Sequence, residues 1–124
     1  MTRSFTQGVP WHQVYVDYAI ANNIITANDF TDYQRSATRA EMGYIFSRSL
    51  PAAEFAEINT VNSLPDVNNG TPYSSSILML YKAGIVMGDT TGAFFPANPI
   101  TRAEASAIIS RLILPDTRTS GKTY

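Results

Sequence analysis

The chain of 124 residues has no cysteine, one histidine and nearly balanced charge, and each shortage excludes a class of function. Without cysteine there is no disulfide, no thiolate metal site and no cysteine nucleophile. The single histidine, His12, leaves little for histidine-based metal binding or acid–base chemistry. Nine basic and ten acidic side chains are scattered along the chain, which argues against a polyanion groove. We therefore expect no metal, no cofactor and no nucleic-acid partner.

Long apolar runs are also missing. No run approaches the roughly 20 residues that span a bilayer, and the first residues lack the charged segment and apolar core of a signal peptide. We expect a mature or excised soluble segment without membrane insertion. The signal peptide of a secreted parent would then lie outside it.

What the chain does contain is an internal duplication. The tetrapeptide Thr-Arg-Ala-Glu occurs at residues 38–41 and 101–104, and seven of the eleven positions from 38 to 48 recur at the offset that separates the two tetrapeptides. Each tetrapeptide has the pattern of a capping box, in which threonine and glutamate satisfy the first amides of a helix. The sequence predicts a helix after each box, and Pro51 and Pro115 are its stop signals. One helical face is formed in the first copy by Met42, Ile45, Phe46, Ser49 and Leu50, and in the second by Ala105, Ile108, Ile109, Leu112 and Ile113.

A second helix is predicted upstream of each capping box, because apolar positions again follow one helical spacing: His12, Val16, Ala19, Ile20 and Asn23; Tyr73, Ile77, Leu80, Tyr81 and Gly84. Pro10 and Pro72 lie where the first helical turn tolerates proline, and Asn23 and Gly84 where a helix ends through a left-handed residue. Residues 52–58 are expected to form a short helix before an extended connector. The prediction is an all-α fold of two helix–loop–helix repeats, residues 1–63 and 64–124, of which the first is degenerate.

Copy two carries an ordered set of further motifs: Asp66-Val67, Tyr73, Gly84-Ile85, Gly88-Asp89, Phe94 to Ile100, and residues 101–104. This set resembles the S-layer homology (SLH) repeat over nearly all of residues 64–114. Copy one, residues 9–50, is similar more weakly, through Trp11, Asn23-Ile24 and residues 38–41. It has Ala27-Asn28 where copy two has Gly88-Asp89.

The resemblance implies a function outside the cell, at the bacterial cell wall. Proteins of this family hold a surface protein or exoenzyme on the wall by binding a secondary cell-wall polysaccharide, often one that bears a pyruvate ketal. It also implies three repeats around a pseudo-threefold axis, with ligand grooves between neighbouring lobes. Only two repeats are visible, so a third SLH repeat or another chain is an expected partner.

Capping does not explain the arginine of the tetrapeptide. A cation in the first turn opposes the helix dipole, so the recurrence of Arg39 and Arg102 indicates another use. A guanidinium beside free N-terminal amides suits a carboxylate such as that of a pyruvate ketal. The alternatives are a salt bridge between lobes or a solvated side chain. Arg102, in the better-preserved copy, is the first candidate for ligand binding and Arg39 the second.

Four further residues are candidates for sugar contact. Trp11 and Tyr73 open the upstream helices, where an aromatic face packs against a sugar ring or, equally, into the core. Gly88 and Asp89 offer close backbone approach and an acceptor for hydroxyls, or simply a turn closed by the aspartate. Asp66 is expected to cap or turn the chain instead of touching ligand.

Catalysis is not expected. Glu41 and Glu104 resemble a glycosidase pair in kind, but capping accounts for both. The stretch from Asp89 lacks the oxygen ligands of a calcium loop, and neither a nucleophile elbow nor a phosphate-binding glycine loop is present. The alternative function, favoured by the degenerate loop of copy one, is a structural module that assembles with other protein lobes without binding sugar.

Overall fold

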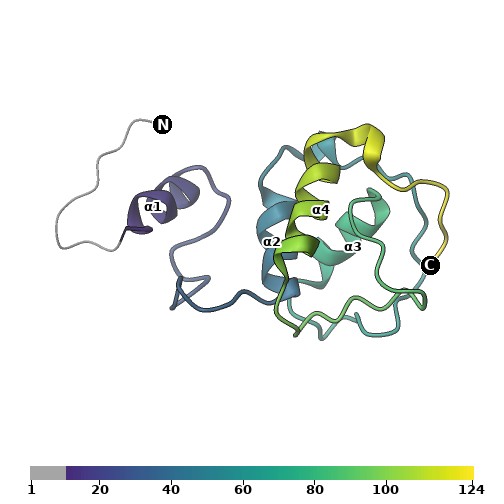
Figure 1. The fold of residues 1–124 in the computed structure, drawn as a ribbon, viewed down its shortest axis with the longest axis horizontal. Coiled ribbons are helices and arrows are strands. Elements are labelled where there is room, and N and C mark those ends of the chain that lie inside the picture. Colours follow the sequence, from purple (N-terminus) through teal and green to yellow (C-terminus); the bar gives the residue numbers. More distant parts are fainter. Residues whose placement is uncertain (1–10) are drawn as a thin grey trace. The chain divides into compact units, whose positions relative to one another are not determined.

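The computed structural model describes residues 11–124, and its regular structure in that range is helical (Figure 1). The helices are α1 (Gln13–Ala21), α2 (Arg39–Arg48), α3 (Ser74–Lys82) and α4 (Arg102–Ile113), with two 3-10 helices, η1 (Ala52–Glu54) and η2 (Pro115–Thr117). Only isolated β-bridges occur among the described residues. The all-α prediction is confirmed. No described helix is both long enough and apolar enough to span a bilayer.

The chain divides into two compact units, residues 1–35 and 36–124. The described part of the first unit contains α1, none of whose residues is fully buried. The helix ends at Ala21 with Asn22 as its C-cap, and Asn23 follows with a φ of 59°, so the predicted left-handed exit is confirmed. Pro10, predicted to lie in the first turn, falls outside the described residues.

Both predicted capping boxes are present in the second unit. Thr38 Oγ1 accepts from the Glu41 amide at 3.1 Å, and Glu41 Oε1 accepts from the Thr38 amide at 2.8 Å. Thr101 and Glu104 repeat this exchange at 3.1 and 2.9 Å. Each threonine cap typically contributes about 1 kcal/mol. The starts of α2 and α4 are therefore determined by residues within a single helical turn.

The start of α3 differs from the prediction. Tyr73, with a φ of 59°, precedes the first helical residue Ser74, so Pro72 lies before the helix and not in its first turn. The end of α3 is as expected: Gly84 has a φ of 75°. A Cβ at this position would also collide with the Thr119 carbonyl oxygen, which is why the exit needs glycine.

The core of the second unit lies where α2 packs on α3, and α4 adds Ile108 and Leu112 to it (Figure 1). Its largest fully buried side chains come from α3 and the segment after it: Ile77, Leu80, Tyr81, Ile85 and Phe94. The predicted apolar face of α4 is only partly covered, because Ile109 and Ile113 are 46% and 62% exposed. In α2 the buried positions include Gly43, where a Cβ would lie 3.6 Å from an Ile77 side-chain carbon. A small residue thus brings α2 close to α3, and the buried face shifts accordingly.

The duplication extends through the C-terminal tail. The helices η1 and η2 lie at equivalent positions of the two copies, because the offset between them equals the offset between the two tetrapeptides. Thr60 and Thr123 are also equivalent positions, and they form a parallel bridge. The helix predicted at residues 52–58 is present only as η1. Arg118 closes the tail against α4 by donating to the carbonyl oxygens of Arg111 at 2.8 Å and Leu112 at 3.1 Å.

The compact units do not coincide with the sequence repeats. The second unit begins at Ser36, so it takes α2 from copy one together with all of copy two. The physical reason is that α2 buries its face on α3, a helix of the other copy. The division into repeats at residues 1–63 and 64–124 describes the duplication and stays a prediction.

Candidate functional site

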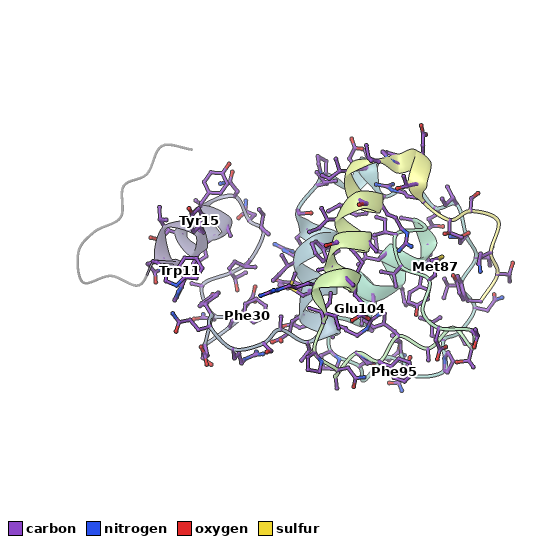
Figure 2. The ribbon with its side chains drawn as sticks, viewed as in Figure 1. Trp11, Tyr15, Phe30, Met87, Phe95 and Glu104 are labelled. Carbon is purple, nitrogen blue, oxygen red and sulfur yellow. The ribbon has the colours of Figure 1, made fainter. Side chains whose placement is uncertain are left out.

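A groove of about 390 Å³ brings three of the six predicted site residues together within the second unit. Arg39 at the start of α2, Gly88 and Asp89 line it, together with residues of the loop that leads into α4 and of its first turn. We call it the Arg39 groove. Figure 2 shows two of its other lining residues, Phe95 on that loop and Glu104 on α4. A larger pocket of about 770 Å³ also includes Gly88 and Asp89, but neither predicted arginine lines it.

Arg39 is held by three contacts from copy two. Its Nε donates to the Phe94 carbonyl oxygen at 2.6 Å, its guanidinium carbon lies 4.8 Å from the centre of the Phe94 ring, and Nη1 pairs with Glu104 Oε2. The side chain is 13% exposed, and this burial lowers the pKa of the guanidinium. Nη2 makes no hydrogen bond within residues 11–124. The salt bridge weighed as an alternative therefore exists, and it joins the two copies.

The backbone amides beside Arg39 are not free, contrary to the expectation for a carboxylate site. The Arg39 amide donates to the Asn98 carbonyl oxygen at 2.8 Å, and the Ala40 amide donates to that of Pro96 at 3.0 Å. The loop before α4 thus covers the N-terminus of α2. A ligand in the groove meets the arginine side chain and not the helix amides.

Glu104 has two roles, one for each carboxylate oxygen. Oε1 completes the capping box of α4, and Oε2 pairs with Arg39. Sequence reasoning missed the second role because the first one accounted for the residue fully. The only signal was the repetition itself, since an arginine in one copy and a glutamate in the other are complementary charges.

Gly88 and Asp89 form a turn closed by the aspartate, which is the structural role that the sequence also allows. Gly88 has a φ of 70°, and a Cβ there would lie 2.5 Å from Tyr81 Oη and 2.7 Å from the Ala93 carbonyl oxygen. Asp89 Oδ1 accepts from the Thr91 hydroxyl, the Thr91 amide and the Ala93 amide, and these bonds lower the pKa of the carboxyl. None of these three hydrogen bonds is made to the other oxygen, Oδ2. The turn leaves one acceptor exposed at the groove.

Asp66 stabilises the loop on the far rim of the groove. Its two oxygens accept from the amides of Phe94 at 2.9 Å and Phe95 at 2.7 Å. Phe95 has a φ of 58°, and its side chain is 48% exposed. Asp66 therefore holds a loop that is distant in the sequence, whereas the expected role was a local cap or turn.

The comparison with protein families decides the identity of this segment. The S-layer homology domain model matches residues 63–106, the stretch that supplies the turn, the loop and the first turn of α4. Residues 63–106 are an S-layer homology domain. Domains of this family anchor surface proteins to the bacterial cell wall, and they are binding domains without catalytic activity. No curated protein and no solved structure matches the chain.

The remaining predicted residues do not line the Arg39 groove. Arg102, in the SLH domain, is exposed, and its side chain makes no hydrogen bond or ion pair with any described residue. Tyr73 stacks on Tyr44, with ring centres 4.5 Å apart, and packs against the core. Trp11 belongs to the other compact unit, where it is 65% exposed. Ligand contact by these three residues stays a prediction.

Proposed function

We propose that the chain binds a secondary cell-wall polysaccharide and so holds a surface protein non-covalently on the outside of the bacterial wall. The observation that carries this proposal is the groove in which Arg39 meets Gly88 and Asp89 beside the SLH domain's loop. Grooves that combine a few fixed polar groups with an aromatic or apolar wall are typical of ligand sites.

The polar groups of the groove match sugar hydroxyls, which both donate and accept. Arg39 Nη2 supplies donors without another partner in residues 11–124, and Asp89 Oδ2 supplies an acceptor. Because Nε and Nη1 are already anchored, the guanidinium is presented in one orientation at little entropic cost. This fixed presentation makes Arg39, and not Arg102, the first candidate for ligand contact.

The charges in the groove favour an acidic substituent such as a pyruvate ketal less than they favour sugar hydroxyls. Glu104 already neutralises Arg39, and Asp89 adds a second carboxylate to the groove. A ligand carboxylate therefore competes with Glu104 for the guanidinium. The proposal consequently rests on hydroxyl recognition, with pyruvylation as a property to be measured.

The test is retention of the 124-residue chain on purified sacculi of the source organism, before and after extraction of the secondary polymer. Arg39→Lys keeps the charge but loses the second anchored nitrogen, and we expect it to weaken retention about tenfold. Arg102→Lys makes the same change in the same motif: retention like wild type assigns the contact to Arg39, whereas weakened retention assigns it to Arg102. Equal retention of the wild-type chain on extracted walls contradicts the proposal.

A second candidate function is a protein assembly module, and exposed apolar side chains at the C-terminal end of α4 favour it. Ile109 and Ile113 on the helix and Leu114 just beyond it are 46%, 62% and 56% exposed. The occupant of this face would be a third SLH repeat or another chain. This candidate predicts concentration-dependent oligomers in sedimentation that Ile113→Gln abolishes, with no effect of wall extraction.

A further inference from the structure

Phe95 is a strained aromatic residue at the rim of the Arg39 groove. Its φ of 58° lies in the left-handed region, which is disfavoured for every residue that has a Cβ. Three other positions of the SLH domain with positive φ are glycines, which adopt this region without strain. Strained residues persist where the surrounding structure holds them, and they cluster at functional sites.

Tyr73 provides an internal comparison, because it is the other described residue of this domain with a Cβ and a positive φ. Its ring is accounted for by stacking on Tyr44 and by packing against the core. The Phe95 ring, in contrast, stacks on no aromatic ring of residues 11–124 and is 48% exposed. Core packing therefore does not explain why a phenylalanine stands at this position.

The backbone around Phe95 is nevertheless firmly held. Asp66 accepts from the amides of Phe94 and Phe95, and the Asn98 amide donates to the Phe95 carbonyl oxygen at 3.2 Å. The preceding Phe94 is 1% exposed and anchors the loop in the core. These contacts hold the backbone that carries the Phe95 ring, and Phe95 lines the same groove as Arg39 and Asp89.

We propose that Phe95 is the platform on which the apolar C–H face of a sugar ring packs, while Arg39 and Asp89 contact hydroxyls at its edge. The proposal rests on the polysaccharide binding inferred above and adds the residue that contacts the apolar face of the sugar ring. An exposed phenyl face on a firmly held backbone, beside a donor and an acceptor, complements a neutral pyranose, which has one apolar face and a polar rim. Asp66 acts through Phe95 and is a positioning residue.

The test uses three variants of the 124-residue chain and the soluble polysaccharide released from the sacculi. Phe95→Gly removes both the ring and the strain, so it should raise the melting temperature by about 5 °C while lowering affinity about tenfold or more. Phe95→Tyr keeps the ring face and should bind like wild type. Ile113→Ala removes an exposed apolar side chain away from the groove and is the control.

Saturation-transfer NMR supplies a readout that a purely structural role would not change. Saturating aromatic protons should label the ring C–H protons of the polysaccharide with wild type and Phe95→Tyr but not with Phe95→Gly. If Phe95→Gly binds as tightly as wild type, the platform is wrong and polysaccharide binding stands. If wild type does not bind the polymer, both proposals fail. Self-association that depends on Phe95, without polymer binding, makes the residue a protein contact and also overturns the platform.

Discussion

The ion pair between Arg39 and Glu104 offers a substitution that separates the two roles of Glu104. Glu104→Gln keeps a side-chain oxygen for the capping box, since glutamine serves at that position as well as glutamate does. It removes the negative charge that faces Arg39. Any loss of stability is then due to the pair and not to the helix cap.

The magnitude follows from how far the two side chains are buried. Arg39 is 13% exposed and Glu104 is 38% exposed, so the pair lies between a surface ion pair, at roughly 0.2–1 kcal/mol, and a buried one, whose breakage costs about 3–5 kcal/mol. After discounting for the exposure of Glu104, we expect a loss of about 1–1.5 kcal/mol in the free energy of unfolding. Arg39 keeps its bond to the Phe94 carbonyl oxygen and its place over the Phe94 ring, which limits the damage.

The assay is urea unfolding followed by circular dichroism, with an unchanged slope as evidence that the unfolding reaction is the same. Thr101→Ala, which removes only the cap, is the companion variant. A double-mutant cycle with Arg39→Gln should give a coupling of about 1 kcal/mol. Glu104→Gln should also raise affinity for an acidic polysaccharide several-fold, because the guanidinium is no longer neutralised. A free energy of unfolding equal to that of wild type within experimental error, with no coupling in the cycle, would refute the reasoning.

Three further predictions concern the turn that lines the groove. Gly88→Ala should cost about 2–4 kcal/mol in urea unfolding, because its Cβ would lie 2.5 Å from Tyr81 Oη; Gly121→Ala, with a similar φ of 75° but open space around it, should cost about 1 kcal/mol. Hydrogen bonds lower the pKa of Asp89, so its contribution to stability is present above the ordinary pKa of 3.8 and is lost as pH falls through the lower folded value. Acid titrations of stability should therefore flatten in Asp89→Asn, and an unchanged titration would contradict this. Tyr81→Phe removes the bond to the Gly92 carbonyl oxygen and should cost about 1 kcal/mol. Because burial raises the pKa of Tyr81, the hydroxyl stabilises the fold fully below its ordinary pKa of 10.0 and less as pH rises further, and ultraviolet titration should detect its delayed ionisation.

Local signals predicted the helices well. The capping boxes, the left-handed exits at Asn23 and Gly84, and the all-α class are confirmed because each depends on residues within one or two turns. Ile109 and Ile113 share the predicted apolar face of α4 but are largely exposed. Helical spacing shows which residues share a face, but not how much of that face another element covers.

The groove could be predicted only in part. The motif order placed Gly88, Asp89 and an arginine among the candidates, and the groove contains all three. Phe95 was missed as a groove residue because its backbone strain and its exposure are tertiary properties. Glu104 was missed because its role in the capping box already explained it, so its ion pair with Arg39 was not expected. The bonds from the amides of Phe94 and Phe95 to Asp66 could not be predicted, because these residues are far apart in the sequence.

By itself the sequence determined that two helices begin at Thr38 and Thr101, because a capping box is closed by residues three positions apart. It also determined the family of residues 63–106, through motifs in a fixed order. It ranked Arg102, in the better-preserved copy, ahead of Arg39, although the two stand in identical tetrapeptides. Only the tertiary structure shows which of the two is anchored: the loop before α4 folds onto the start of α2 and holds Arg39, whereas no described residue pairs with the Arg102 side chain. Identical local sequences thus acquire different chemistry because long-range packing supplies their partners.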